Sequence, residues 1–313
     1  MIELKKMIQG SFLFDELMSK HTSYGIGGPA KAYITPRNKS DLANILKFAE
    51  KHDIQTYFVG SGSNLLVSDD GVDGFVITLG KSLNQLKINE SQVYAESGVM
   101  LGKLVKECTK RNLSGIESLI GVPGTLGGAL IMNAGAFGGE ISNFLKNVNV
   151  MDMNGEIKRY NKEEIDFSYR SSTFPKNEII INAEFELIKS DKDTVSEKKL
   201  GASGGRKATQ PLKFRSAGSV FKNPAKGQAA GYYIDQAGLK GSKVGDAEIS
   251  PIHANFFVNH GNAKADDIVE LIKIARKTVK EKFGVLLELE VKTLGFKSGT
   301  FKVWIKTKNK KLI

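Results

Sequence analysis

The chain has 313 residues, 41% hydrophobic and 25% charged, which is ordinary for a soluble globular protein of two or three domains. Its 45 basic against 34 acidic residues give a net charge of +11, which makes anionic small ligands, nucleic acid or a membrane surface the candidate partners. The single Cys108 excludes an internal disulfide framework, no apolar run could cross a bilayer, and the first 20 residues lack a signal-peptide core, so we expect a cytoplasmic protein.

The predicted elements begin with a strand at 30–35 and an amphipathic helix at 41–52, which we expect Ser40 to cap. A second helix at 100–112 contains Cys108, which we interpret as a packing residue because no motif surrounds it. Further strands are predicted at 55–60, 75–79, 92–98, 147–153, 156–160 and 178–188.

The segment 189–211 is polar, charged and interrupted by glycine, so we place a domain boundary there. A strand at 254–259 and a long helix at 264–284 follow, the helix with an apolar stripe that includes Phe283 and with Gly284 past its end. Residues 285–291 alternate as a strand does, which places Glu288 and Glu290 on one face. Two glutamates there would by default be solvated.

Two glycine-rich loops could bind a ligand. Residues 60–74 follow a buried strand, and their backbone N–H groups and serines could surround a phosphate, although a simple turn explains this loop alone at least as well. Residues 115–141 mix glycine with apolar residues, which indicates buried backbone approached closely by another group, or a tightly packed turn region. Together the two loops suggest a long ligand such as a dinucleotide.

Three other features could carry chemistry. Arg170, in "DFSYRSSTF", could grip a carboxylate, although most arginines are simply exposed. Ser219, in "RSAGSVFKNP", is either a turn serine or part of an active site. His21 and His253 have no metal-ligand spacing to other histidines or to cysteine, so we predict no metal site.

Eight stretches occur in one order between about residues 15 and 296, and together they resemble the UDP-N-acetylenolpyruvoylglucosamine reductase (MurB) family. They are "HTSYGIGGPA", "VGSGSNLLVSDDG", "GIESLIGVPGTLGGALIMNAGAFGGEI", "YRSSTF", "SAGSVFKNP", "GYYIDQAGLKGSKVGDAEIS", "HANFFVN" and "KFGVLLELEV". The segment 189–211 lacks the tyrosine of a longer substrate loop, so the chain resembles the shorter-loop, type II-like subclass.

The resemblance implies an α+β fold, in which a two-part FAD-binding domain of the vanillyl-alcohol-oxidase (PCMH) type precedes a C-terminal α+β substrate-binding domain. The expected bounds are 1–75 and 76–205 for the two FAD-binding subdomains, 206–296 for the substrate-binding domain and 297–313 for a basic tail.

It also implies the reaction. NADPH reduces FAD, and the reduced flavin gives hydride to the enolpyruvyl group of UDP-GlcNAc-enolpyruvate, which yields UDP-N-acetylmuramate for peptidoglycan. We accordingly expect a cytoplasmic flavoprotein oxidoreductase that supports cell wall biogenesis, cell shape and cell division. It would be a monomer without a nucleic-acid partner or a membrane span.

The family pattern assigns catalysis to three residues. Ser219 would deliver the proton, while Arg170 and Glu290 would stabilise charge on the substrate. The residues expected to bind the cofactor are Tyr24, Gly60, Ser61, Gly62, Ser63, Asn64, Leu65, Gly121, Pro123, Gly124, Thr125, Gly127, Gly128, Asn133, Ala134, Gly135 and Arg215. Those expected to bind substrate are Tyr169, Gln210, Lys222, Asn223, Tyr232, His253 and Asn255.

Two alternatives stay open at this point. One is another flavin oxidoreductase of the same fold, against which the serine motif and the Glu290 segment argue, because they lie in the substrate domain. The other is a non-catalytic basic binding protein whose glycine loops are structural.

Overall fold

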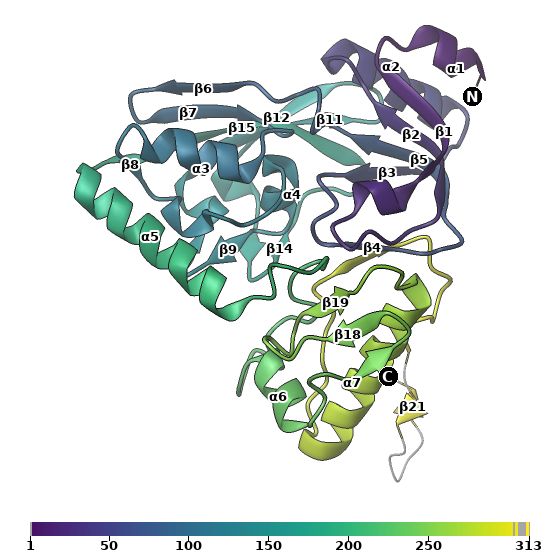
Figure 1. Ribbon diagram of the computed structural model, residues 1–313. Coiled ribbons are helices and arrows are strands. Elements are labelled where there is room, and N and C mark those ends of the chain that lie inside the picture. Colours follow the sequence, from purple (N-terminus) through teal and green to yellow (C-terminus); the bar gives the residue numbers. More distant parts are fainter. Residues whose placement is uncertain (1, 303, 306–310, 313) are drawn as a thin grey trace. The chain divides into compact units, whose positions relative to one another are not determined.

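The computed structural model describes residues 2–302, 304–305 and 311–312 (Figure 1). The chain forms two compact units. The first comprises Met1–Asp15, Lys31–Ser61 and Gly74–Arg206, and the second Glu16–Ala30, Gly62–Asp73 and Lys207–Ile313. Of the expected basic tail 297–313, residues 303, 306–310 and 313 lie outside the described residues. No helix in the described ranges is long and apolar enough to span a membrane.

The first strands form a four-stranded sheet in the order β1 (Ser11–Leu17), β2 (Pro29–Thr35), β5 (Val72–Thr78) and β3 (Thr56–Val59). Helix α2 (Lys39–Lys51) buries Leu42 and Leu46 in one hydrophobic cluster with Phe75. The expectation that Ser40 caps this helix is wrong. Asn38 is the cap, because its side chain accepts the backbone N–H three residues on at 2.9 Å.

The larger sheet of the first unit is antiparallel, in the order β12 (Ile157–Asn161), β11 (Leu145–Asp152), β15 (Glu178–Glu186), β7 (Gln92–Glu96) and β6 (Leu86–Asn89). Helices α3 (Leu101–Thr109) and α4 (Leu126–Ile131) lie against one of its faces (Figure 1). Val93, Leu104 and Phe185 belong to the buried cluster on that face, and so does Cys108, which confirms its interpretation as a packing residue.

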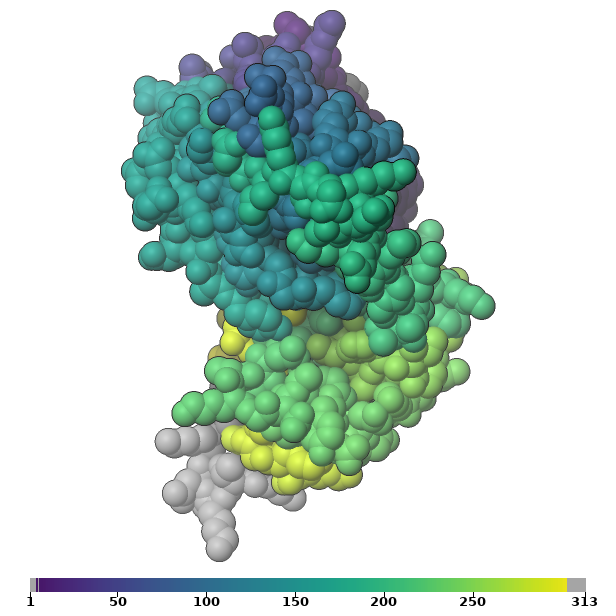
Figure 2. Space-filling model, turned by 90° about the vertical axis from the view of Figure 1, so that its left-hand side faces the viewer, coloured from purple at the N-terminus to yellow at the C-terminus, as the bar shows by residue number. Residues whose placement is uncertain are grey.

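Helix α5 (Lys192–Thr209) occupies the polar segment in which we placed a domain boundary. Its two buried residues, Val195 and Ala202, are seven positions apart, which places them two turns apart on one side. The remaining positions are mostly charged or glycine, so the apolar stripe is too narrow to recognise from the sequence. Figure 2 shows this segment on the surface of the first unit.

The second unit combines a parallel pair, β4 (Leu65–Val67) with β20 (Lys292–Leu294), and an antiparallel sheet of β17 (Lys243–Val244), β18 (Ala247–Ile249) and β19 (Phe257–Asn259). Two helices pack with them, α6 (Ala230–Gln236) and α7 (Ala265–Phe283). Gly284 ends α7 with φ 70°, as expected. Phe283 was expected on the buried stripe but is 39% exposed, because it is the last residue of the helix.

The expected strand at 285–291 is only partly present. Leu289 makes an isolated bridge to Phe221, and a regular ladder begins only at Lys292. The alternation itself holds, because Leu287 and Val291 are buried and their neighbours are more exposed. The backbone there is hydrogen-bonded to residues 220 and 222, which leaves too short a ladder for a named strand.

Short elements complete the described chain. The helices are α1 (Ile2–Met7) and 3-10 turns at Met18–His21, Glu117–Leu119, Ile141–Phe144 and Lys162–Glu164. The strands are β8 (Leu113–Ser114), β9 (Gly135–Ala136), β10 (Gly139–Glu140), β13 (Phe167–Ser168), β14 (Ser171–Ser172), β16 (Ile188–Lys189), β21 (Trp304–Ile305) and β22 (Lys311–Leu312).

Candidate active site

Ser219 lies in an extended segment of the second unit, which is bridged to its neighbours on both sides. Ser219 itself pairs with Phe256, and Phe221 pairs with Leu289. Gly218 has φ 74°, a backbone conformation that favours glycine, so the glycine sets the direction in which the chain enters Ser219. Ser219 is half-buried. The structure therefore places Ser219 in an extended segment that pairs with neighbouring backbone, and not at the tip of a turn.

Glu290 lies beside the serine segment because the two backbones are hydrogen-bonded. Its N–H donates to the Val220 carbonyl at 2.8 Å, and its own carbonyl accepts the Asn64 Nδ2 amide at 3.2 Å. Lys292 donates its N–H to the Asn64 carbonyl at 3.1 Å. The second unit thus brings together the first glycine-rich loop, the Ser219 segment and the Glu290 segment, which are far apart in the sequence.

Two lysines, Lys222 and Lys292, lie in these paired segments. Lys222 forms an ion pair with Glu288 at 2.6 Å. Burial lowers the pKa of Lys292, and the nearby positive charge of Lys222 lowers it further, while Glu288 and Glu290 oppose the shift. Lys292 was not selected from the sequence, although its place two residues after Glu290 was a usable signal.

Three residues that were expected to contact substrate make hydrogen bonds within the second unit. The Asn255 side chain accepts the Phe221 N–H at 3.0 Å and donates to the Phe221 carbonyl at 2.8 Å, so it clamps the serine segment. Asn223 Oδ1 accepts the Ala230 N–H at the start of α6, at 3.1 Å. His253 Nδ1 accepts the Asn255 N–H at 3.2 Å, and burial lowers the pKa of this histidine.

The second unit contains further residues that were expected to bind substrate or cofactor. Tyr232 is 49% exposed, and Gln210 lies just after α5. Tyr24 is fully buried, and burial raises the pKa of its hydroxyl. A Cβ on Gly25 would lie 2.0 Å from the Arg215 guanidinium, so glycine is required where that arginine lies against the backbone. Ser63 precedes Asn64 in the same loop, and Leu65 begins β4 directly after it.

In the first unit, the two glycine-rich loops meet. A Cβ on Gly60 would lie 2.6 Å from Thr125 Oγ1, which in turn accepts the Gly128 N–H at 3.4 Å and caps α4. Asn133 is fully buried with φ 41°, and its amide donates to Glu140 at 2.8 Å. The remaining loop residues expected to bind the cofactor lie in this unit as well: Ser61, Gly121, Pro123, Gly124, Gly127, Ala134 and Gly135.

Arg170 lies in the two-residue turn between β13 and β14, where its backbone has φ 56°. Such a conformation costs free energy in a residue other than glycine, so the surroundings must hold it. Its guanidinium carbon lies 5.0 Å from the Tyr169 ring centroid. Arg170 also lies near Gly135, because a Cβ added there would come within 3.4 Å of the guanidinium.

A second arginine joins this part of the first unit. Arg206 of α5 lies 5.9 Å from the Phe137 ring centroid, and its Nε is buried without a hydrogen-bond partner in the part of the chain that the structure describes. Burial lowers its pKa, and the charge of Arg170 lowers it further. The sequence offered no signal for Arg206, because its segment was interpreted as a domain boundary.

Comparisons with known proteins agree with these two loops and with the serine segment. An FAD binding domain family matches residues 30–161, and the UDP-N-acetylenolpyruvoylglucosamine reductase C-terminal domain family matches residues 210–294. The UDP-N-acetylenolpyruvoylglucosamine reductase of Clostridioides difficile is 43% identical over 282 residues, which are 90% of this chain and 92% of that protein. The chain belongs to the UDP-N-acetylenolpyruvoylglucosamine reductase (MurB) family.

Two further comparisons extend this result. The Clostridium novyi reductase is 42% identical over 283 residues, which are 90% of this chain and 92% of that protein. The crystal structure of the MurB enzyme from Thermus caldophilus aligns with a TM-score of 0.79 at 36% identity, covering 92% of this chain and 99% of that one. The expected α+β fold, an FAD-binding domain joined to the C-terminal domain of the MurB family, is confirmed.

The residues of the glycine-rich loops fit FAD. Ser61 Oγ and Asn133 Oδ1 are buried and have no hydrogen-bond partner within the described ranges. Buried polar atoms left in this state are costly, and a bound polar ligand would satisfy them. Both atoms belong to residues of the MurB pattern that are expected to bind the cofactor. Gly60 and Thr125 are two more such residues, and a Cβ on Gly60 would lie 2.6 Å from Thr125 Oγ1. Among the described residues, no three His, Cys, Asp or Glu side chains are grouped as metal ligands.

Proposed function

We propose that the protein is an FAD-dependent reductase that uses NADPH to convert UDP-GlcNAc-enolpyruvate to UDP-N-acetylmuramate, a step in the synthesis of peptidoglycan precursors. The observation that carries this proposal is the pairing of the Ser219 and Glu290 segments, through the 2.8 Å hydrogen bond from the Glu290 N–H to the Val220 carbonyl. It brings the proton donor and the acidic residue of the family pattern into one local structure.

The chemistry explains why these residue types are needed. When bound, the flavin supplies the hydride for the terminal carbon of the enolpyruvyl double bond. Negative charge then develops on the substrate carboxylate and on the adjacent carbon, where Arg170 and Glu290 stabilise it. Glu290 would have to be protonated or to share a proton there, since an ionised carboxylate would repel that charge.

Ser219 completes the reduction by donating a proton from Oγ to the carbon beside the carboxylate. A serine hydroxyl is a weak acid, but an enolate carbon is basic enough to take its proton. Asn255 supports this role, because its amide fixes the backbone two residues after the serine. We further propose that the cofactor and substrate residues act as the family pattern assigns them, including Tyr24, Asn64, Arg215, Lys222 and Tyr232.

Our proposal for the whole protein follows from this activity. It would be a cytoplasmic monomer with FAD-binding subdomains at 1–75 and 76–205 and a substrate-binding domain at 206–296, and it would support cell shape and division. NADPH and the UDP-sugar would be its small-molecule partners, without nucleic acid.

The visible spectrum of the purified protein tests the proposal. We expect a yellow protein that NADPH bleaches under anaerobic conditions and that UDP-GlcNAc-enolpyruvate turns yellow again. A colourless protein that takes up no FAD would make it a non-catalytic binding protein. A flavoprotein that the enolpyruvyl nucleotide does not reoxidise would instead be a different oxidoreductase of the same fold.

A further inference from the structure

One face of the five-stranded sheet carries a continuous row of polar side chains. Lys87 pairs with Tyr94, Tyr94 with Glu184, and Glu184 with Asn147, across β6, β7, β15 and β11. Direct cross-strand partners lie on the same face, and residues next to each other along a strand lie on opposite faces. Since Phe185 belongs to the core beneath α3 and α4, this row lies on the opposite face of the sheet.

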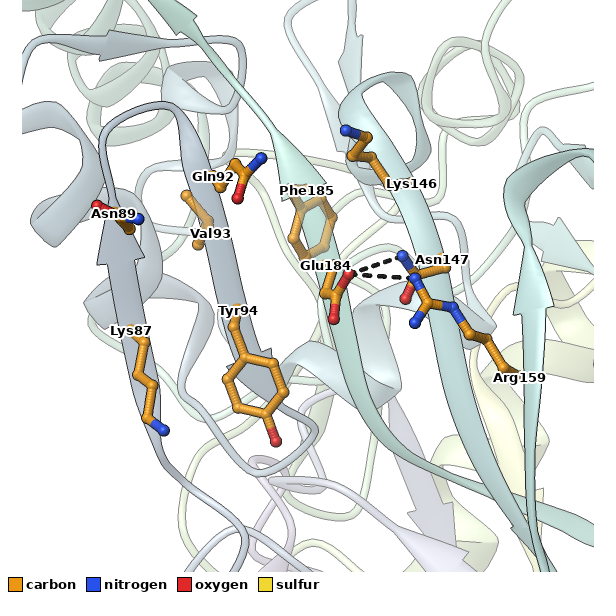
Figure 3. A pocket seen from close by; sticks show the side chains of 10 residues that line it. All are labelled: Lys87, Asn89, Gln92, Val93, Tyr94, Lys146, Asn147, Arg159, Glu184 and Phe185. Atoms are coloured by element: carbon orange, nitrogen blue, oxygen red, sulfur yellow. Dashed lines mark hydrogen bonds and ion pairs between the residues drawn. The ribbon is translucent and has the colours of Figure 1, made fainter.

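A pocket of about 300 Å³ opens over this row (Figure 3). Three of its side chains are cationic, and Glu184 is the one carboxylate among those that line it. The Glu184 carboxylate accepts the Asn147 amide at 2.8 Å and lies 3.4 Å from the Arg159 guanidinium. The lining residues are Lys87, Asn89, Gln92, Val93, Tyr94, Lys146, Asn147, Arg159, Glu184 and Phe185. We call this the sheet pocket.

Asn147 distinguishes the sheet pocket from an ordinary solvated sheet face. It is only 4% exposed, and although its Nδ2 donates to Glu184, its Oδ1 is buried and accepts no hydrogen bond from any described residue. An irregularity in the pairing of β11 with β15 between Leu145 and Asn147 leaves Lys146 as an extra residue there. Such bulges re-aim side chains. A buried oxygen that accepts no hydrogen bond costs free energy, and a donor from a bound molecule would satisfy it.

We propose that the sheet pocket binds a small hydroxylated anion, of the size of a monosaccharide phosphate. Its volume is at the lower end of small-molecule sites, which excludes a dinucleotide. Lys87 and Arg159 supply the positive charge for the anionic group, and Lys87 lies 5.9 Å from the Tyr94 ring centroid. The Tyr94 ring offers a flat surface to a sugar, and Asn147 Oδ1 accepts a hydroxyl. The pocket shares no residue with the candidate active site.

Calorimetry on the FAD-loaded protein tests this proposal with glucose 6-phosphate as the probe. We expect saturable binding that the double variant Lys87→Gln, Arg159→Gln weakens about tenfold or more, because two charged hydrogen-bond donors are lost. Glucose and orthophosphate, each of which supplies only half of the recognised chemistry, should bind much more weakly.

The matched control is the double variant Lys110→Gln, Lys189→Gln, which removes the same two charges from exposed positions outside the pocket. It should bind glucose 6-phosphate as the unchanged protein does, and both double variants should keep the melting temperature. Absence of saturable binding would overturn the proposal, and so would equal weakening by both double variants. Orthophosphate or glucose binding as tightly as the sugar phosphate would overturn the assigned ligand class.

Discussion

At the scale of single residues, Ser219 is the sharpest test of the reaction. With Ser219→Ala, NADPH should still bleach the flavin, because that half-reaction needs no proton from this side chain. Reoxidation by the enolpyruvyl nucleotide should slow by about 10²–10⁴, the usual contribution of a general acid. Anaerobic stopped-flow spectroscopy measures both steps, with Ser216→Ala in the same segment as the control. Equal slowing of both half-reactions would assign Ser219 a structural role.

Cys108 gives a second test, this time of packing. Burial raises the pKa of its thiol from 9.0 to about 12. At pH 8 the thiolate fraction is therefore about 10³ lower than in the unfolded chain, and the native protein should react at least that much more slowly with a thiol reagent. Absorbance of the released chromophore, in buffer and in urea, measures the two rates. Similar rates would mean that Cys108 is accessible in the native state.

The raised pKa of Cys108 also sets the sign of a pH effect on stability. The folded state favours the neutral thiol, so the stabilisation is fully present below the unfolded pKa of 9.0 and is lost as the pH rises toward about 12. The free energy of unfolding should thus decline on the alkaline side, and less steeply in Cys108→Val. Urea titrations at pH 8 and pH 10 measure this difference.

At the scale of elements, α5 contains a matched pair of glycines. A Cβ on Gly204 would meet nothing within 4 Å, so Gly204→Ala should stabilise the protein by about 0.5–1 kcal/mol through helix propensity. A Cβ on Gly205 would lie 2.9 Å from the Phe137 ring, so Gly205→Ala should lose that gain or destabilise. Thermal melts measure both variants. A similar shift in both would show that α5 does not dock on Phe137 as described.

Helices α5 and α7 and the segment 285–291 show which elements the sequence could predict. Helix α7 was predictable because a wide apolar stripe and Gly284 mark it, whereas α5 buries only Val195 and Ala202 and has no such stripe. The segment 285–291 has the alternation of a strand, but its partner is the short stretch at 220–222. Pairing between distant segments is not encoded in local periodicity.

At the candidate site, too, some features could be predicted from the sequence and others could not. Ser219 and Glu290 could be selected from motifs, but the hydrogen bonds that join their segments to each other, and the Glu290 segment to Asn64, could not. The positive φ of Arg170 is likewise a property of the folded hairpin. Arg206, which lies near Phe137 and Arg170 in the first unit, was missed because it belongs to a helix that the sequence did not indicate.

At the scale of the whole molecule, the net charge of +11 is the dominant electrostatic feature. FAD, NADPH and the UDP-sugar all carry phosphates, so a positive field raises their concentration near the surface and speeds their encounter. Among the described cations, burial lowers the pKa of Arg206 in the first unit and that of Lys292 in the second.

Salt should therefore slow the capture of NADPH more than it slows turnover. The Debye length falls from about 30 Å at 0.01 M salt to about 8 Å at 0.15 M, which removes long-range attraction but leaves bound-state contacts largely intact. We expect kcat/KM for NADPH to fall by about tenfold over this range while kcat changes little. Steady-state rates across a sodium chloride series measure both, and sucrose at equal osmolality is the control for non-ionic effects. A kcat/KM that does not change with salt concentration would mean that the excess of basic residues does not speed the encounter of NADPH with the enzyme, because long-range attraction is what salt screens.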